Sequence, residues 1–177
     1  MTDRSAPQAL VPIPSQTVGP FFHFCLTPDT THGRLFPDRG SRIRLAIHVA
    51  DGAGEPVSDA AVEIWQACDE AGGDSAFGRL ATGADGTCEF DTVRPCSPPD
   101  GGAAHVNVCL FARGLLRQVH TRLYFAGDPR LGDDPVLALV PANRRSTLLA
   151  GPDPAHADRW VFRLRLQGDG ETVFFDV

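Results

Sequence analysis

Lysine is absent from this 177-residue sequence, and tyrosine and methionine occur once each, so arginine supplies all 16 basic residues. The 22 acidic residues outnumber them and give a formal net charge of −6. Nucleic acids and anionic membrane surfaces need a basic face, so this balance argues against both as partners. No apolar run approaches the length that spans a bilayer, and the first residues lack a signal-peptide pattern, so we expect a cytoplasmic protein.

Several familiar signatures of chemistry are missing as well. The sequence has no Cys-x-x-Cys pair, no His-Glu-x-x-His motif, no phosphate-binding glycine loop and no Gly-x-Ser-x-Gly elbow. Their absence argues against the zinc, nucleotide and hydrolase sites that these motifs build. The five cysteines are odd in number and widely spaced, which indicates reduced thiols rather than a disulfide framework. They stand at positions 25, 68, 88, 96 and 109.

Glycine and proline, by contrast, are abundant at 18 and 15 residues, and they favour short strands joined by turns. Residues 1–40 are rich in Pro, Gly, Ser and Thr and have few periodic apolar positions, which is typical of an extended N-terminal arm. Residues 41–177 alternate apolar and polar positions in a series of short runs. We therefore predict an all-β domain over 41–177, a β-sandwich of short antiparallel strands with one short helical region.

The alternation is clearest in the run RIRLAIHVAD, which begins at residue 42. Its side chains Ile43, Leu45, Ile47 and Val49 share one face, as expected of a half-buried strand.

Two local signals add detail to the predicted sandwich. Asp85-Gly86 lies between two strand-like runs and predicts a β-hairpin there. Residues 133–151 form the plausible helical region, broken by Pro141 and closed near Gly151.

The stretch AAHVNVCLFARG (103–114) carries the first candidate for a functional site. In a strand, His105, Asn107 and Cys109 face one way and the apolar residues between them face the other. His105 and Cys109 would lie about 13 Å apart at roughly 3.3 Å per residue, too far to share one metal ion. The residues alone favour the polar face of a sheet over a metal site, and leave both open.

Six blocks of sequence occur in one order between residue 14 and the C-terminus. They are PSQTVGPFFHF (14–24), EIWQA (63–67), HVNVCLFARG (105–114), HTRLYF (120–125), RRSTLLA (144–150) and LQGDGETVFFDV (166–177). Together they resemble the intradiol ring-cleavage dioxygenase family. Within it they are most similar to the alpha chains of its two-chain members, which act on protocatechuate.

The resemblance bears directly on the metal question. In this family the beta chain holds Fe(III) with two tyrosines and a His-x-His pair on a strand. His105 matches the first histidine, but Asn107 stands at the second, and the segments 67–78 and 93–102, where tyrosines would fall, contain none. The single tyrosine, Tyr124, occupies a position that the family does not use for iron. The resemblance therefore implies that the partner beta chain, and not this chain, holds the Fe(III) cofactor.

The resemblance also implies a substrate-binding role for the arm residues Thr17, Gly19, Pro20 and Phe21 and for Arg113 of the LFARG block, but no catalytic residue and no metal ligand. A guanidinium suits a catechol that bears a carboxylate. Phe21 stands where a tyrosine is often found, so a hydroxyl is missing at that position. The alternatives are a solvated arginine or an ion-pair arginine between strands, and a plain turn of the arm that packs on the sandwich.

The resemblance implies a non-iron-binding alpha subunit that pairs with a beta chain. Together they would use O2 to cleave protocatechuate to 3-carboxy-cis,cis-muconate, as an Fe(III)-dependent dioxygenase in bacterial aromatic catabolism. This chain alone would be inactive. One alternative is a non-enzymatic β-sandwich binding module. Another is a stand-alone intradiol dioxygenase, against which the shortage of tyrosine weighs.

Overall fold

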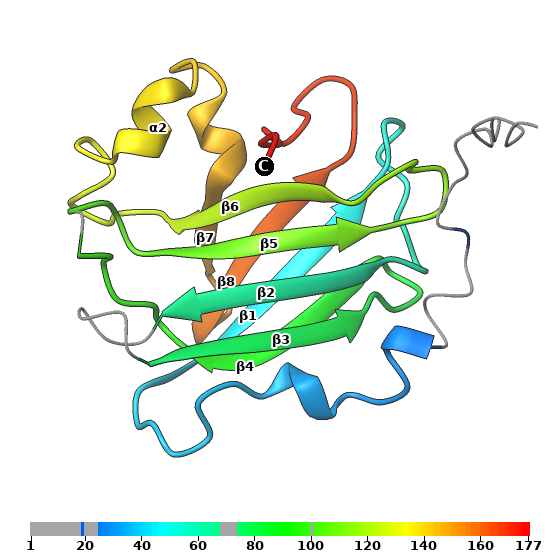
Figure 1. The fold of residues 1–177 in the computed structure, drawn as a ribbon, viewed down its shortest axis with the longest axis horizontal. Helices are drawn as coiled ribbons and strands as arrows, with labels where there is room; N and C mark the ends of the chain where they lie inside the picture. The colour runs from blue at the N-terminus through cyan, green and yellow to red at the C-terminus, as the bar shows by residue number, and fades with distance from the viewer. Residues whose placement is uncertain (1–18, 20–24, 68–73, 100) are drawn as a thin grey trace, which may run out of the picture.

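A computed structural model of the chain describes residues 19, 25–67, 74–99 and 101–177 (Figure 1). The strands are β1 (Arg42–Ala50), β2 (Ala61–Ala67), β3 (Ser75–Ala81), β4 (Thr87–Val93), β5 (His105–Phe111), β6 (Val119–Phe125), β7 (Leu149–Asp153) and β8 (His156–Arg165). The same elements include a short α-helix, α2 (Pro135–Leu139), and the 3-10 turns η1 (Thr31–Gly33) and η2 (Arg145–Leu148). The predicted all-β fold is confirmed.

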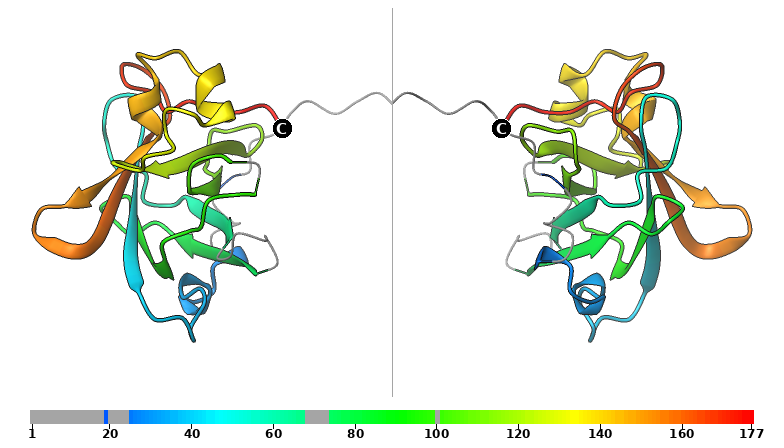
Figure 2. Two further views of the ribbon diagram at one scale, coloured as in Figure 1. Left: turned by 90° about the vertical axis from the view of Figure 1, so that its left-hand side faces the viewer. Right: turned by 90° about the vertical axis from the view of Figure 1, so that its right-hand side faces the viewer.

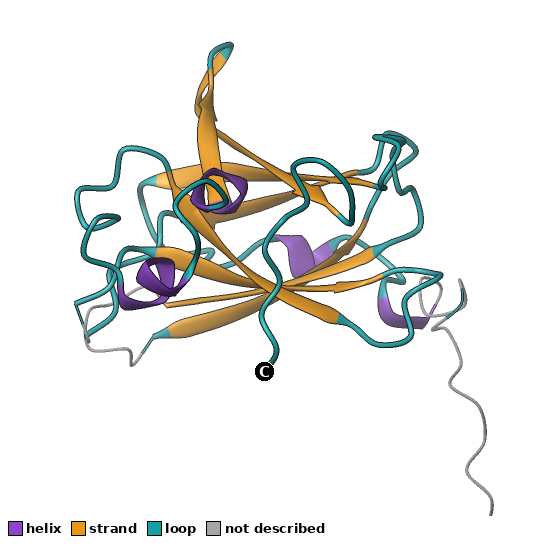
Figure 3. Cartoon of the chain, turned by 90° about the horizontal axis from the view of Figure 1, so that it is seen from above, coloured by secondary structure: helices purple, strands orange, loops and turns teal. Residues whose placement is uncertain are grey.

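The strands follow the order β3-β2-β5-β6-β7-β8-β1-β4 and fold over into two packed layers (Figures 1 and 3). β3, β2, β5 and β6 form one layer, and β8, β1 and β4 lie in the other. β7 joins the layers because it pairs with β6 at one end and with β8 along its length. Most pairings are antiparallel, as predicted, while β1–β8 and β6–β7 are parallel. In side view the β7–β8 ribbon projects beyond the body of the sandwich (Figure 2).

The core lies between the layers and is built by the predicted alternation. Leu45, Ile47 and Val49 of β1 are at most 1% exposed. From the other layer, the apolar side chains of β5, beginning with Val106, pack into the same cluster. A second, smaller cluster forms where α2 packs outside β6. Its buried members are Ala103, Tyr124, Leu137, Val140 and Leu148.

The predicted hairpin at Asp85-Gly86 is wrong, although the turn itself exists. Asp85 accepts a hydrogen bond from the Thr87 amide at 3.0 Å, and Gly86 has a φ of +72°. The flanking strands do not pair with each other: β3 pairs with β2, and β4 pairs with β1 in the other layer. The Gly86 carbonyl accepts a bond from Val49 of β1 at 2.8 Å, and a Cβ at Gly86 would lie 2.6 Å from the Val49 carbonyl oxygen. The turn therefore carries the chain from one layer to the other.

The segment that precedes β1 contributes to this core. Leu35 and Phe36 are buried in the main apolar cluster, and the Leu35 amide donates to the Asp91 carbonyl at 2.9 Å. The arm boundary at residue 40 stays a prediction, but the chain packs on the sandwich from residue 35 at the latest.

Candidate functional site

The outer face of the β3-β2-β5-β6 layer carries the residues singled out on β5. Asn107 is exposed and lies opposite Trp65 of β2, while His105 is partly buried. Cys109 lies opposite Glu63 and is only 2% exposed. Burial raises the pKa of the Cys109 thiol to about 12, so it is neither a thiolate nor a ready nucleophile at neutral pH.

His105 is tied to the backbone at the start of β5. Its Nδ1 lies 3.0 Å from the Ala103 carbonyl oxygen, which can only accept, so Nδ1 carries the proton. The ring also stacks at a tilt against Tyr124, with 5.5 Å between the ring centroids. These contacts hold the imidazole as part of the packing at this end of the sheet.

Tyr124 is fully buried and donates its hydroxyl to Asp134 Oδ1 at 3.1 Å. Burial raises its pKa to about 12, and the neighbouring Asp134 carboxylate adds to the rise. The side chain is therefore a neutral phenol at physiological pH.

Asp134 joins this cluster to helix α2. Its carboxylate caps the helix by accepting from the amides of Val136 and Leu137 at 3.0 and 2.8 Å, and it accepts from the Ala103 amide at 2.8 Å. Burial raises the pKa of Asp134, but the three amides and the Tyr124 hydroxyl outweigh it and lower the pKa below its usual value. The buried carboxylate thus stays charged and fastens α2 to the start of β5.

The donors on this face do not fit Fe(III), the metal of the resembled family. Asn107 offers a neutral amide, and Tyr124 is a phenol that donates to a carboxylate. His105 donates from Nδ1 to a carbonyl and so supplies at most one neutral imidazole nitrogen. Ferric iron requires hard anionic donors. Over residues 25–67, 74–99 and 101–177, no three His, Cys, Asp or Glu side chains cluster as metal ligands would.

A shallow pocket of about 430 Å³ opens beside Asn107 on the same face, between Trp65, Arg122 and the C-terminal residues. Trp65 is 41% exposed and stacks on Phe77 with 4.8 Å between ring centroids. Arg79 lies over the Phe77 ring and pairs with Glu63 at 2.7 Å. The face therefore offers aromatic surface with fixed charges, as protein interfaces commonly do.

Arg113 lies just beyond the end of β5. Its Nε forms an ion pair with Asp59 Oδ2 at 2.8 Å, and its side chain is 65% exposed. Gly19, the described part of the predicted arm site, is partly buried with a φ of +71°. Thr17, Pro20 and Phe21 lie outside the described residues.

Asp59 is the residue that the sequence analysis missed at this site. It belongs to the turn before β2, where an aspartate is an ordinary turn residue and does not suggest a site. Ala61 of β2 pairs with Phe111 of β5, and continuing that antiparallel register by two residues places position 59 beside position 113. The pairing register of β2 and β5 brings the two residues together, and a single sequence does not contain that register.

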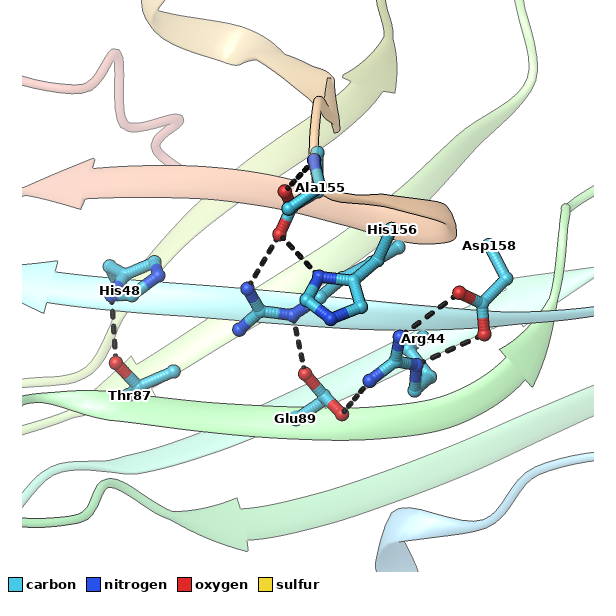
Figure 4. A network of polar contacts seen from close by, with 9 residues as sticks. Arg44, His48, Thr87, Glu89, Ala155, His156 and Asp158 are labelled. Carbon is cyan, nitrogen blue, oxygen red and sulfur yellow. Dashed lines mark hydrogen bonds and ion pairs between the residues drawn. The ribbon is translucent and has the colours of Figure 1, made fainter.

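A second polar cluster lies on the outer face of the other layer (Figure 4). Arg44 holds Asp158 through two bonds of 3.0 Å, and Arg159 bonds Glu89 at 2.7 Å and Asp153 at 2.8 Å. The Arg159 hydrogen bond lowers the pKa of Asp153 to about 2. These pairs link β4, β1, β8 and β7 in a ladder in which each arginine lies between carboxylates, which indicates a structural role.

Comparison with known proteins identifies the fold and the family. The chain is 39% identical to the protocatechuate 3,4-dioxygenase alpha chain of Burkholderia cepacia, over 93% of this chain and 96% of that protein. The alpha chain of Pseudomonas putida is 38% identical over 92% and 95% of the two chains. The chain belongs to the protocatechuate 3,4-dioxygenase alpha-chain family.

More distant similarities extend to other dioxygenases. The Burkholderia cepacia beta chain is 30% identical over 75% of this chain and 67% of its own length. Among solved structures, the dioxygenase domain of a carbohydrate-binding fusion protein from Streptomyces sp. SirexAA-E superposes with a TM-score of 0.62 at 26% identity, over 89% and 99% of the chains. An intradiol ring-cleavage dioxygenase from Tetranychus urticae shares the fold, with a TM-score of 0.63 at 18% identity over 75% and 84% of the chains. No protein-family model matches the sequence.

The described residues include no helix long and apolar enough to cross a membrane.

Proposed function

We propose that this chain is the non-iron-binding alpha subunit of a heteromeric protocatechuate 3,4-dioxygenase. The observation that carries the proposal is the identity of 38–39% to two alpha chains over almost their whole length. The donor set around His105 supports it, because these side chains do not suit ferric iron.

In this proposal the partner is a beta chain, and that chain holds the Fe(III) that activates the catechol. The assembled enzyme takes protocatechuate and O2, opens the ring between its two hydroxyl-bearing carbons and releases 3-carboxy-cis,cis-muconate. The alpha chain has no catalytic residue of its own and shapes the substrate pocket. The four described cysteines, Cys25, Cys88, Cys96 and Cys109, are not in disulfides, which suits the reducing cytoplasm, where we place the enzyme.

The alpha chain's contribution to the pocket is Arg113 together with the arm residues Thr17, Gly19, Pro20 and Phe21. The Arg113 side chain lies just beyond the end of β5 and is 65% exposed, so its guanidinium can reach a carboxylate outside the chain. Guanidinium and carboxylate form strong charge-assisted hydrogen bonds, and this pairing would select a catechol acid over a plain catechol.

The test is to purify the chain alone and together with its beta chain, and to measure iron content, visible absorption and O2 uptake with protocatechuate. We expect the lone chain to be colourless, free of stoichiometric iron and inactive, and the pair to be coloured, iron-loaded and active. Stoichiometric iron on the lone chain would overturn the subunit assignment in favour of a stand-alone dioxygenase. An iron-free, inactive pair would favour a binding module.

A further inference from the structure

The ion pair between Arg113 and Asp59 is asymmetric in its burial. The Asp59 side chain is 16% exposed, whereas that of Arg113 is 65% exposed. Asp59 Oδ2 lies 2.8 Å from Arg113 Nε, and Asp59 Oδ1 is buried with no hydrogen-bond partner among the described residues. The Asp59 carboxylate is thus largely buried, and the Arg113 guanidinium is its single charged partner among the described residues.

The backbone on both sides of the pair is held in place. Ala60, which follows Asp59, is fully buried and exchanges hydrogen bonds with Thr82, accepting at 2.9 Å and donating to Thr82 Oγ1 at 3.0 Å. Arg113 sits in a turn that is closed by a bond from the Leu115 amide to the Ala112 carbonyl at 3.3 Å. The carboxylate of Asp59 therefore stands at a fixed position next to the stem of the arginine.

The contact with Asp59 uses the Nε of the Arg113 guanidinium, and much of the side chain is still exposed. A guanidinium is planar, so a contact at its Nε restricts the directions in which the two terminal amines can point. The side chain is 65% exposed, so the guanidinium also has surface open to solvent, where a substrate carboxylate can accept from it. An arginine held in this way loses less side-chain freedom when it binds than one that moves freely.

We propose that Asp59 is a positioning residue: it orients Arg113 toward the carboxylate of the substrate. This inference rests on the proposed function, in which Arg113 contacts that carboxylate. Asp59 itself does not touch the substrate. An ion pair with so exposed an arginine adds little to stability, so its loss should appear in substrate binding and not in folding.

The test is a double-mutant cycle in the assembled alpha–beta enzyme, with Asp59→Asn, Arg113→Ala and the double variant. We expect Asp59→Asn to raise KM for protocatechuate by about threefold to tenfold, with kcat and the melting temperature close to the parent values. In the double variant KM should equal that of Arg113→Ala, because no guanidinium remains to be positioned. Asp158→Asn, which removes an arginine-paired carboxylate from the opposite layer, is the matched control and should leave KM unchanged.

The outcomes separate the two hypotheses. If Arg113→Ala raises KM while Asp59→Asn does not, or if the two effects multiply in the double variant, the positioning role is wrong and the proposed function stands. If Arg113→Ala itself behaves like the parent, the pocket role of Arg113 fails. Should Asp59→Asn prevent assembly, Asp59→Glu displaces the carboxylate by one methylene. We expect a KM rise of about twofold to threefold that disappears in the Arg113→Ala background.

Discussion

Single residues explain why the outer face of the β3-β2-β5-β6 layer does not suit iron. Asn107 replaces a potential imidazole with a neutral amide, and the nearest phenol, Tyr124, is buried and committed to Asp134. Its pKa of about 12 means that ionising it costs more than ionising an exposed tyrosine. The cluster of His105, Tyr124 and Asp134 is therefore part of the packing at this end of the sheet.

Arg113 is the residue whose loss we expect to change kinetics most directly. Replacing Arg113 with alanine in the assembled enzyme should raise KM for protocatechuate by about tenfold to a hundredfold, the range for a charge-assisted hydrogen bond. The KM of parent and variant is measured from steady-state O2 uptake at a series of protocatechuate concentrations.

Arg117→Ala is the matched control for that experiment. Arg117 is also an exposed arginine after β5 and pairs with Asp176 at 3.2 Å, but both partners are largely in solvent. The Arg117→Ala variant should leave KM for protocatechuate unchanged. An equal rise in both variants would mean that the effect reflects net charge and not a contact made by Arg113.

Among the elements, helix α2 depends on tertiary contacts because five residues are too few to be stable alone. Its N-cap Asp134 also bonds Ala103 and Tyr124, so one carboxylate joins the helix to β5 and β6. Asp134→Ala would remove the cap and leave buried donors unpaired. We expect a loss of about 3 kcal/mol in the free energy of unfolding, measured by urea titration of the chain.

Asp133→Ala is the comparison for this element. Asp133 precedes the cap and is exposed, so its replacement should change the free energy of unfolding by less than about 0.5 kcal/mol. Similar losses in both variants would show that Asp134 acts through general charge and not through its four hydrogen bonds.

At the scale of the whole molecule, the charge ladder of Figure 4 makes the stability of the fold depend on pH in the acid range. Hydrogen bonds from Arg159 and Arg44 lower the pKa values of Asp153 and Asp158 below the ordinary value of 3.8. A group with a lowered pKa in the folded state stabilises the fold above its unfolded pKa and loses that contribution as pH falls. The melting temperature should therefore fall between about pH 4 and pH 2.

Asp153→Asn tests the source of that acid sensitivity. The variant cannot bind a proton at this position, so its melting temperature should depend less on pH between about 4 and 2 than the parent's does. An identical pH dependence in both proteins would exclude Asp153 as a contributor.

Much of the fold follows from the sequence because local geometry sets it. Alternation at period two places Ile47 and Val106 inward and Asn107 outward wherever their strands pair, and glycine and proline mark the turns. The ordered blocks likewise point to the family without reference to any contact.

Partners, in contrast, depend on the folded chain. The Asp85-Gly86 turn reverses the chain, but packing between the layers decides that β4 joins β1 and not β3. Asp59 meets Arg113 only after strands distant in sequence have settled into register, and Asp134 meets Ala103 only after α2 has packed beside the chain that leads into β5. Sequence periodicity specifies which face a side chain occupies, and only the tertiary structure specifies what it meets there, because register is a relation between two strands.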